Sequence, residues 1–525
     1  MSLSPYWLRD NCPCVECRDP RNGQKLFRVG DLPDGLAVAE SVEDGDALAV
    51  LWSDGHRSRY PLAWLAGTDE GDGRTEDGKR LWTAADFGPG LPAADWSAYL
   101  GDERERAAVL AAVRRSGFAL LRGVPAVERQ VLEVARSFGY VRETNYGELF
   151  DVRVEPDPTN LAFTGAAIAP HTDNPYRDPV PTLQLLHCLR SDAIGGDSGL
   201  VDGFTAAALL REESPADFAV LTRTPVPFVF RDRRTELRAD RPLIDVDGRG
   251  RIREVRFNNR SIATLRGLTT AELDAFYAAY RRFAAITLRP ELQLTFRLAP
   301  GDCLVFDNTR LLHARTAFET GEGHRHLQGC YADLDSLASH HAVLERRTAA
   351  LDTLEQLFEG EGAGEYLGEA VTLAGHMLQA GALAEAAGAP AHLVAAALLH
   401  DVGHFHGSGL RLMQGEDNRH SHTGADWLGR WFGPDVTEPI RLHVAAKRYL
   451  CTAEPGYRAK LSEASEYTLQ VQGGPMTEEQ AAQFAARPGA RDAVAVRRWD
   501  EQAKDPDLET PPFAHFRPLL AELMA

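Results

Sequence analysis

The chain has 525 residues, too many for one hydrophobic core, so several domains are expected. Acidic residues outnumber basic ones by 76 to 57, which argues against nucleic acid or an anionic membrane as the main partner. The sequence has no apolar run of the roughly 18 residues that a membrane helix needs. Its N-terminus lacks the basic and apolar regions of a signal peptide. Seven cysteines are too few for a disulfide framework in a chain of this length. A cytoplasmic protein is therefore expected.

The N-terminal region is predicted to be a small β-rich domain. The apolar run LAVLW (48–52) is strand-like, and SDGH (53–56) follows as a turn. The region holds four residues of metal-ligand type, namely Cys12, Cys14, Cys17 and His56. Three thiolates and one imidazole are what a tetrahedral zinc site needs, and the metal adds folding free energy to a small core. Because four protein ligands leave no open position, we predict a structural rather than a catalytic Zn(II). The alternative of ordinary free cysteines is disfavoured because three of them lie within six residues.

The middle of the chain mixes helical and strand-like patterns. Residues 103–117 form an amphipathic pattern that ends at a glycine, which predicts a helix. Buried strands are predicted at 118–124, 181–189 and 302–308. After a Gly- and Glu-rich stretch at 360–365, Ala-rich helical sequence continues to the end. The chain is therefore predicted to be a multi-domain α+β protein with three domains, 1–92, 93–350 and 360–525.

An H-x-D pair and a distant histidine lie in the middle region. His171 and Asp173 stand in APHTDNPYRDP, and His313 follows the third strand-like run. Two imidazoles and one carboxylate on one face leave three positions on Fe(II) for a 2-oxo acid and O2. Arg325 lies twelve residues after His313, where its guanidinium can clamp the far carboxylate of 2-oxoglutarate. The pattern predicts a 2-oxoglutarate-dependent iron site.

Four stretches of the first 345 residues share one likeness: WLRDNCPCVEC, NLAFTGAAIAPHTDNPY, GGDSGLVDGF and GDCLVFDNTRLLHARTAFE. On these stretches, residues 5–345 resemble the gamma-butyrobetaine hydroxylase family. The resemblance implies a zinc-bearing N-domain followed by a double-stranded β-helix (jelly roll), with the iron and 2-oxoglutarate ligands just named. It also implies an aromatic cage for a quaternary ammonium group, a cation–π device. The matching substrate positions are Tyr146, Phe150, Asn160, Phe163, Asn174, Asn258 and Tyr331.

The helical C-terminal region carries a second set of metal-ligand residues. These are His376, His400, Asp401, His422, His443 and Asp500. Four imidazoles and two carboxylates suffice for two metals, with Asp401 able to bridge them, and they suit iron or manganese. The order of these residues resembles the HD superfamily, which implies an all-α domain. Most HD proteins hydrolyse phosphate esters and a minority are mixed-valent diiron oxygenases, so the fold leaves the chemistry open.

Further residues resemble the HD oxygenases that cleave hydroxylated phosphonates. Tyr366 and Glu369 precede His376 at that group's spacing, and the resemblance implies that the tyrosine closes an iron site until substrate arrives. His404, Lys447 and Ser465 match its phosphonate-binding positions. A cation, an imidazole and a hydroxyl suit a dianionic phosphonate.

The two resemblances together predict a bifunctional oxygenase for aminoethylphosphonates. The Fe(II)/2-oxoglutarate site would hydroxylate C1 of 2-(trimethylammonio)ethylphosphonate, and the Fe(II)/Fe(III) diiron site would cleave the C–P bond to give glycine betaine and phosphate. Asn174 stands where carnitine-forming enzymes carry an aromatic residue, which argues against butyrobetaine as substrate. The expected partners are an organophosphonate and O2, and a homodimer is one expectation because the hydroxylase family is often dimeric.

Three alternatives stay open from the sequence. The same two steps could act on 2-aminoethylphosphonate and give glycine and phosphate. A butyrobetaine-type hydroxylase could be fused to an HD phosphohydrolase. The HD region could also be a non-catalytic regulatory module of a single-activity hydroxylase.

Overall fold

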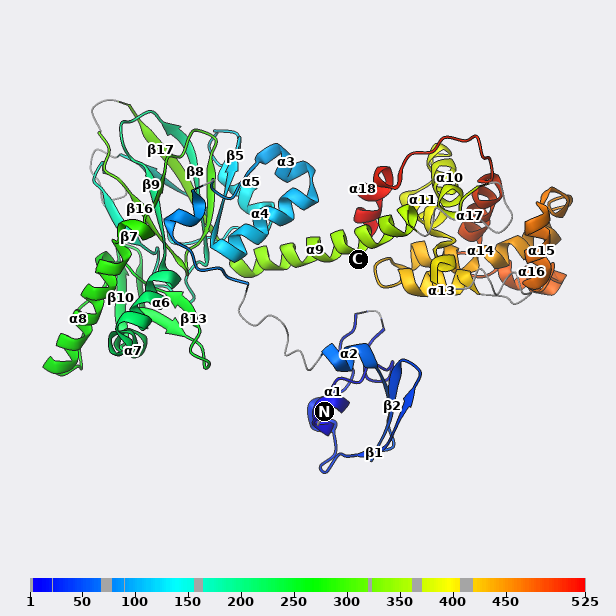
Figure 1. Cartoon of the computed structure of the whole chain (residues 1–525), viewed down its shortest axis with the longest axis horizontal. Coiled ribbons are helices and arrows are strands. Elements are labelled where there is room, and N and C mark those ends of the chain that lie inside the picture. The colour runs from blue at the N-terminus through cyan, green and yellow to red at the C-terminus, as the bar shows by residue number, and fades with distance from the viewer. Residues whose placement is uncertain are drawn as a thin grey trace. The chain divides into compact units, whose positions relative to one another are not determined.

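The computed structural model describes residues 3–20, 22–67, 78–88, 90–154, 164–319, 323–360, 371–406 and 419–524. The chain divides into two compact units. The first comprises residues 1–93, 111–135 and 141–332, and the second comprises 94–110, 136–140 and 333–525. The first unit mixes strands and helices and the second is helical, so the chain is a multi-domain α+β protein (Figure 1).

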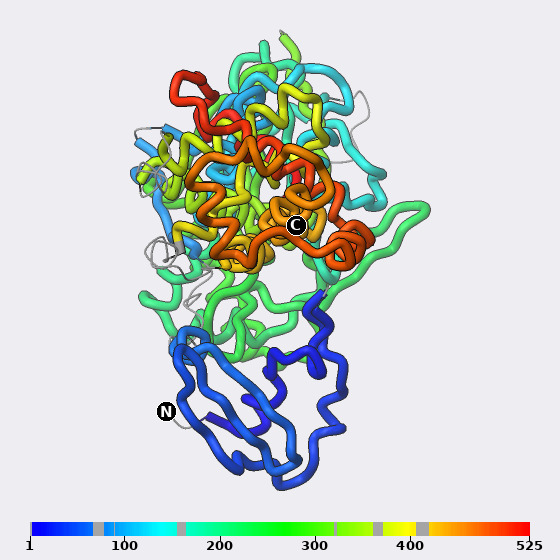
Figure 2. Tube along the Cα trace, turned by 90° about the vertical axis from the view of Figure 1, so that its right-hand side faces the viewer, coloured from blue at the N-terminus to red at the C-terminus, as the bar shows by residue number. Residues whose placement is uncertain are grey.

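The N-terminal part of the first unit is a three-stranded antiparallel sheet in the order β1-β2-β3, drawn in blue in Figure 2. Its elements are α1 (Pro5–Asp10), β1 (Val38–Asp44), β2 (Ala47–Trp52), β3 (Arg57–Pro61) and α2 (Leu62–Gly67). The predicted strand at 48–52 and the turn after it are confirmed. The Trp52 amide donates to the His56 carbonyl (2.9 Å), which closes the turn and places His56 at its end.

Two antiparallel sheets form the larger part of the first unit. Their orders are β14-β9-β16-β7 and β4-β5-β15-β8-β17-β6. The strands are β4 (Ala93–Asp95), β5 (Phe118–Arg122), β6 (Phe150–Arg153), β7 (Ile168–His171), β8 (Leu183–Ser191), β9 (Ser198–Asp202), β14 (Leu294–Phe296), β15 (Cys303–Asp307), β16 (Leu311–Arg315) and β17 (Arg325–Ala332). From β6 to β9, and again from β14 to β17, successive strands alternate between the two sheets.

The elements predicted in this region are confirmed with small shifts at their ends. The predicted strands correspond to β5, β8 and β15, and the predicted helix to α4 (Glu103–Ser116). Gly117 ends this helix with φ of +86°, and a Cβ there would lie 3.0 Å from Leu311 Cγ. Backbone conformation and close packing therefore both require glycine at this turn.

Helices and two hairpins are inserted between β9 and β14. They are α6 (Gly203–Glu213), α7 (Pro215–Arg223), β10 (Val226–Arg231), β11 (Glu236–Arg241), β12 (Ile244–Val246), β13 (Ile252–Val255) and α8 (Thr270–Thr287). Residues of all three helices share one apolar core, which also takes Phe228 from the first hairpin. The β10–β11 hairpin is thereby anchored at Phe228, which has no exposed surface.

The second unit is a helical bundle around an Ala-rich core. Its main helices are α9 (Leu334–Glu359), α10 (Leu373–Ala386), α11 (Ala391–Leu399), α13 (His420–Leu428), α14 (Pro434–Ala453), α15 (Glu463–Val471), α16 (Glu478–Ala485), α17 (Ala490–Gln502) and α18 (Phe513–Leu523). A Cβ on Gly381 would lie 3.1 Å from the Leu398 side chain, so small residues let α10 and α11 approach closely.

Helix α9 passes through residue 350, where the sequence placed the end of the second domain. The three-domain boundaries stay predictions. Among the described helices, none combines the length and the apolar character required to cross a bilayer.

Candidate metal centres

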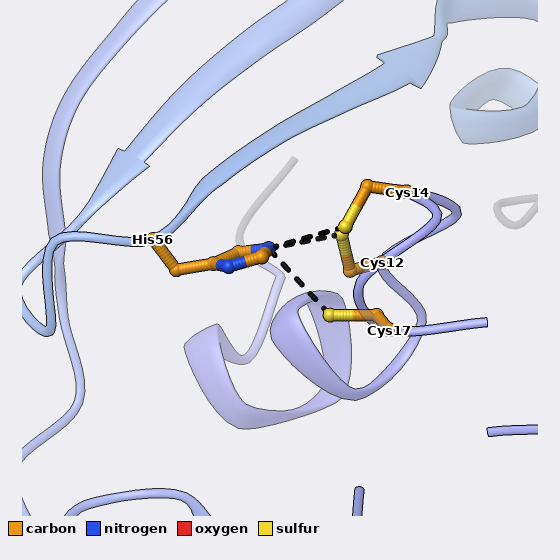
Figure 3. Close-up of side chains that lie close together, drawn as sticks. All are labelled: Cys12, Cys14, Cys17 and His56. Atoms are coloured by element: carbon orange, nitrogen blue, oxygen red, sulfur yellow. Dashed lines mark hydrogen bonds between the residues drawn. The ribbon is translucent and has the colours of Figure 1, made fainter. Parts of the chain in front are cut away.

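The cysteine cluster is assembled from the loop after α1 and the turn between β2 and β3 (Figure 3). The Nε2 atom of His56 lies 3.3 Å from the sulfur of Cys12 and 3.6 Å from those of Cys14 and Cys17. The four ligand atoms all lie within 4.8 Å of one another. The four residues predicted as zinc ligands are therefore brought together at one point.

The sulfurs of this cluster are buried and accept hydrogen bonds. Cys12 and Cys17 are buried, and burial raises the pKa of the Cys17 thiol to about 12. Arg9 Nη1 donates to the Cys17 sulfur (3.2 Å) and Ser58 Oγ to the Cys12 sulfur (3.0 Å). A metal ion would keep such buried sulfurs ionised, and three sulfurs with one nitrogen match the ligand preference of zinc.

Strand pairing assembles the second cluster. His171 ends β7 and is the register partner of His313 on β16, with imidazole centroids 4.1 Å apart. Asp173 follows two residues after β7, with Oδ1 3.4 Å from His171 Nε2 and Oδ2 3.8 Å from His313 Nε2. The three predicted iron ligands thus converge on one face, as a 2-His-1-carboxylate site requires.

Neighbouring groups fix the orientation of this triad. His171 Nδ1 lies 2.9 Å from the Ala169 carbonyl, which leaves Nε2 facing the cluster. The Asp173 carboxylate accepts from Gln184 Nε2 (3.0 Å) and from the Tyr331 hydroxyl (3.2 Å). Asn308 Oδ1 accepts from the Asp173 amide (2.8 Å), so the main chain is held as well as the side chain.

The protonation states of His313 and Asp173 suit a metal. Burial and the neighbouring His171 lower the pKa of His313 to about 3, so this imidazole is neutral near pH 7. Burial alone would raise the pKa of Asp173, but the two imidazoles hold it well below its ordinary value. Neutral imidazoles and an ionised carboxylate are the forms that bind Fe(II).

A cavity of about 600 Å³ opens over the triad. Residues of both larger sheets line it. The sequence-predicted residues that line it are Tyr146, Phe150, Asn174, Asn258, Arg325 and Tyr331. Asn160 and Phe163 lie outside the described residues.

Aromatic rings form one wall of this cavity. Phe150 lies 5.1 Å from Tyr331 and 6.3 Å from Tyr146, measured between ring centroids. Two rings that the sequence analysis missed extend this wall, because Phe230 lies 5.8 Å from Tyr146 and 5.1 Å from Tyr176. Tyr176 stands three residues after Asp173 and could have been noticed, whereas Phe230 gave no signal beyond a strand-like pattern.

Guanidinium groups form another part of the cavity lining, which is positively charged rather than apolar. Arg325 is buried and its Nε donates to the Gly196 carbonyl (3.0 Å). A Cβ on Gly196 would lie 2.8 Å from Arg325 Cδ, so this glycine makes room for the arginine. Arg231, Arg260 and Arg315 line the same cavity and were not predicted. The cavity can therefore hold anionic groups in addition to the metal.

The helical unit brings a third cluster together around Asp401, which follows the C-terminal end of α11. Three other side chains of this cluster meet on the side of its Oδ2 atom. His400 Nε2 and His376 Nε2 lie 3.4 Å and 3.7 Å from this oxygen. Asp500 Oδ1, from α17, lies 3.4 Å from His376 Nε2. These residues can form one metal position.

The other oxygen of Asp401 faces a second set of imidazoles. Oδ1 lies 3.3 Å from His420 Nε2, 3.4 Å from His443 Nε2 and 3.9 Å from His404 Nε2. A carboxylate with one oxygen toward each group of imidazoles has the arrangement of a bridge between two metals. Helices α10, α13, α14 and α17 and the end of α11 supply these ligands, whereas His404, on the short turn 402–406, lies farthest from Asp401 and beside the ligand set.

The prediction of His422 as a ligand is not supported by this geometry, because His420 occupies the place expected for it. Both residues lie in the first turn of α13, and side chains two positions apart on a helix point roughly 200° apart. His420 is buried at the cluster, so His422 points outward and is exposed. The RHSH sequence offers two candidate histidines, and only the phase of the helix distinguishes them.

Backbone carbonyls orient the imidazoles of this cluster. The Nδ1 atoms of His376, His400 and His443 lie 2.7 to 2.8 Å from the carbonyls of Ala503, Ala397 and Ile440. Their Nε2 atoms are thus available to ligands at the centre. Burial would raise the pKa of Asp401, but the surrounding imidazoles hold it well below its ordinary value. The residues fit two metal ions.

A small pocket of about 40 Å³ adjoins this cluster. The predicted residues His404, Lys447 and Ser465 all line it. Lys447 Nζ donates to Thr468 Oγ1 (2.9 Å), and burial together with Arg497 lowers the pKa of Lys447 to about 7.

Further polar residues, which the sequence analysis missed, line the same pocket: Thr468, Gln472, Arg497 and Lys504. Lys504 Nζ donates to Ser465 Oγ (2.7 Å). Tyr366 and Glu369 lie outside the described residues.

Comparison with known proteins places each region of the chain. Residues 77–331 match the family described as Taurine catabolism dioxygenase TauD, TfdA. Residues 1–66 match the gamma-butyrobetaine hydroxylase-like N-terminal family, and residues 373–472 match the HD domain.

Individual relatives cover different shares of the chain. Gamma-butyrobetaine dioxygenase of Pseudomonas sp. (strain AK-1) is 40% identical over 354 residues, which are 66% of this chain and 91% of the relative. The human gamma-butyrobetaine dioxygenase is 31% identical over 359 residues, 66% of this chain and 92% of its own. The [1-hydroxy-2-(trimethylamino)ethyl]phosphonate dioxygenase (glycine-betaine-forming) of Leisingera caerulea is 45% identical over 170 residues, 32% of this chain and 87% of its own.

The two-histidine, one-carboxylate triad beside a cavity, together with the family match, defines a non-haem iron dioxygenase that uses 2-oxoglutarate. The chain belongs to the TauD/TfdA dioxygenase family, in its gamma-butyrobetaine hydroxylase-like branch, and carries an HD domain in addition.

Proposed function

We propose that this chain is a bifunctional oxygenase that degrades 2-(trimethylammonio)ethylphosphonate. The dioxygenase cavity hydroxylates C1, the carbon next to phosphorus. The HD centre then breaks the C–P bond of the 1-hydroxy product and releases glycine betaine and phosphate. The observation that carries the proposal is that both pockets combine metal-ligand clusters with cations suited to a phosphonate.

In the dioxygenase cavity, different residues bind the two anionic groups of the reaction, namely the far carboxylate of 2-oxoglutarate and the phosphonate of the substrate. Arg325 binds the far carboxylate of 2-oxoglutarate through its guanidinium. Arg260 and Asn258 lie in the segment 258–261 and line the same cavity, where they hold the phosphonate. The positive charge of Arg260 contributes to the lowered pKa values of both Asp173 and His313, which supports its place near the triad.

The aromatic wall receives the other end of the substrate. Tyr146, Phe150 and Tyr331 present ring faces to a quaternary ammonium group, which cation–π attraction stabilises. The two ends of the substrate then fix C1 relative to His171, Asp173 and His313. Fe(II) bound to the triad, with 2-oxoglutarate and O2, supplies the oxidising chemistry. One C1–H bond becomes C1–OH, while 2-oxoglutarate becomes succinate and CO2.

In the second pocket, a buried ammonium group receives the phosphonate of the hydroxylated intermediate. Lys447, His404 and Ser465 lie around the pocket and bind its oxygens. From the resemblance, Tyr366 and Glu369 are proposed to close this site before substrate arrives. Two iron ions, which the residues around Asp401 would hold, would supply the redox chemistry. The 1-hydroxy compound and one O2 together contain the atoms of glycine betaine and phosphate, so the step balances.

The named reaction of the Leisingera relative supports this second step. Its substrate is a 1-hydroxylated trimethylamino phosphonate and its product is glycine betaine. The 170 residues of that match are about as many as the chain has from residue 360 to its end. The alternation of strands between two sheets likewise supports a double-stranded β-helix, and the Cys12 cluster supports a structural Zn(II).

The proposal is tested by phosphate release from the full chain loaded with Fe(II). With 2-(trimethylammonio)ethylphosphonate, 2-oxoglutarate and O2, we expect succinate, phosphate and glycine betaine. His420→Ala is expected to abolish phosphate while leaving succinate formation, and His422→Ala serves as the matched control from the same helical turn. Succinate without phosphate from the intact chain, or equal phosphate from both variants, contradicts the proposal.

Phosphate release from the 1-hydroxy compound without O2 would instead favour the phosphohydrolase alternative. Turnover of 2-aminoethylphosphonate to glycine at an equal rate would favour the unmethylated substrate.

A further inference from the structure

The two carboxylate oxygens of Asp173 have different surroundings. Each lies near one imidazole of the triad, with Oδ1 3.4 Å from His171 Nε2 and Oδ2 3.8 Å from His313 Nε2. Oδ2 in addition accepts hydrogen bonds from Gln184 Nε2 (3.0 Å) and from the Tyr331 hydroxyl (3.2 Å). An ionised carboxylate offers about two lone-pair sites on each oxygen, so two donors occupy those of Oδ2. Oδ1 is the oxygen left available to a metal ion.

Strand pairing brings the two donors together. Gln184 on β8 and Tyr331 on β17 are register partners, and both side chains line the dioxygenase cavity. Directly opposed residues of neighbouring strands lie side by side on one face of a sheet. Gln184 is 1% exposed and Tyr331 is 4% exposed, so neither donor can turn toward bulk water. The sheet therefore fixes both donors relative to Asp173.

The Gln184 amide is committed to Asp173. In the part of the chain that the structure describes, Nε2 makes the hydrogen bond to Asp173 Oδ2, and Oε1 is buried without a hydrogen-bond partner. Burying an unpartnered carbonyl oxygen costs free energy. An apolar side chain of similar size would avoid this cost, so packing alone does not account for glutamine at this position. Its hydrogen bond to the metal-ligand residue does.

The Tyr331 side chain can be divided into two parts with separate contacts. Its ring lies in the aromatic wall, 5.1 Å from the Phe150 ring between centroids. Its hydroxyl contacts Asp173. Phenylalanine at this position would keep the ring and remove only the hydrogen bond, so the two contacts can be tested separately.

We propose that Gln184 and the Tyr331 hydroxyl are positioning residues that reserve Oδ1 of Asp173 for the metal and keep Oδ2 from joining it. Two imidazoles and one carboxylate oxygen leave three open positions on Fe(II). The keto-acid end of 2-oxoglutarate takes two of them, and O2 needs the third. A second oxygen from Asp173 would occupy that third position. The inference concerns the dioxygenase site alone and does not depend on which phosphonate is the substrate.

The test probes the third position with nitric oxide, which binds Fe(II) where O2 would. The full chain is loaded with saturating Fe(II) and 2-oxoglutarate without O2, and NO is titrated while EPR records the iron–nitrosyl signal. The part of the signal that depends on 2-oxoglutarate belongs to the dioxygenase site. The variants are Tyr331→Phe, Gln184→Met and the double variant.

Gln328→Met is the matched control. Gln328 is also a buried glutamine of the same sheet, but its Nε2 donates to Asp151 Oδ1 (3.1 Å) instead of to the triad. The substitution removes the same amide from the same kind of environment. It therefore reports what the loss of a buried glutamine does by itself.

Wild type and Gln328→Met should bind NO with equal affinity. The double variant should raise the Kd for NO roughly 10- to 100-fold, the loss typical when residues that orient a metal ligand are removed. Each single variant keeps one donor on Oδ2 and should raise the Kd by less than about tenfold. Tyr331→Phe removes only one oxygen atom, so it keeps the inference testable if Gln184→Met does not fold.

Two results overturn the inference. One is an NO affinity that stays at the wild-type value in the double variant. The other is an equal loss of NO affinity in Gln328→Met. The titration contains no phosphonate, so a chain that turns over none of the phosphonates would contradict the proposed function and leave this result unchanged.

Discussion

The two catalytic regions hold similar ligands in different frameworks. In the dioxygenase region, adjacent strands place His171 and His313 in register over a cavity of about 600 Å³. In the HD region, five helices and a turn converge on Asp401 beside a pocket of about 40 Å³. The first has an aromatic wall and room for two ligands, whereas the second is small and polar. In the proposed function, a substrate would be held at both ends in the first region and mainly by its anionic end in the second.

A substitution at the metal cluster of one region should leave the activity of the other region unchanged. Asp401→Asn removes the carboxylate that faces both groups of imidazoles. Loss of a residue that only orients a metal ligand costs roughly 10- to 100-fold in activity, so phosphate release should fall by more than about a hundredfold here. Succinate formation should continue at the wild-type rate, as measured by coupled assay. Loss of both activities in a folded variant would show that the two centres are not separate.

The next largest effect is expected from removing a positive charge from the dioxygenase cavity. Arg260→Gln removes a cation proposed to hold the phosphonate, and KM should rise roughly 10- to 100-fold, because hydrogen bonds to charged groups contribute about 1.5–3 kcal/mol. Arg238→Gln, on the β10–β11 hairpin but outside the cavity lining, is the control. An equal effect of both variants, or an effect on KM for 2-oxoglutarate alone, would assign Arg260 a different role.

The strand framework was easier to predict than the helical one. His171, Asp173 and His313 were predicted correctly as neighbours because the H-x-D pair, the distal histidine and the resemblance to the gamma-butyrobetaine hydroxylase family all indicated the same three residues. The choice between His420 and His422 depends on where α13 begins, and the sequence pattern does not fix that residue. Phe230 and Arg260 reach the cavity from an inserted segment, so only tertiary packing could place them.

The smaller pocket should show the stronger dependence on pH. Burial lowers the pKa of Lys447 to about 7, and only its protonated form attracts a phosphonate. Binding of the 1-hydroxy compound should therefore weaken as pH rises through about 7, by up to about tenfold per unit. Lys447→Arg should move this loss to higher pH, because arginine stays charged. KM profiles from pH 6 to 9 measure the effect, and parallel profiles for both proteins would exclude Lys447 as its cause.

The smallest effect on activity is expected at the cysteine cluster, which lies apart from both pockets in sequence. Cys12→Ser should remove one zinc per chain and lower the unfolding temperature of the N-terminal domain by about 5 °C or more, since 1 kcal/mol corresponds to roughly 4–8 °C in a domain of this size. Steady-state kcat should be retained. Calorimetry with metal analysis measures both, and retained zinc in the variant would contradict the ligand assignment.

Metal content at full occupancy tests the central claim most directly. The ligand clusters predict three iron ions and one zinc ion per chain, with one iron at His171, Asp173 and His313 and two around Asp401. In Asp401→Asn, iron should fall toward one per chain while zinc is retained. A fully loaded wild-type chain with a single iron beside its zinc would contradict the account.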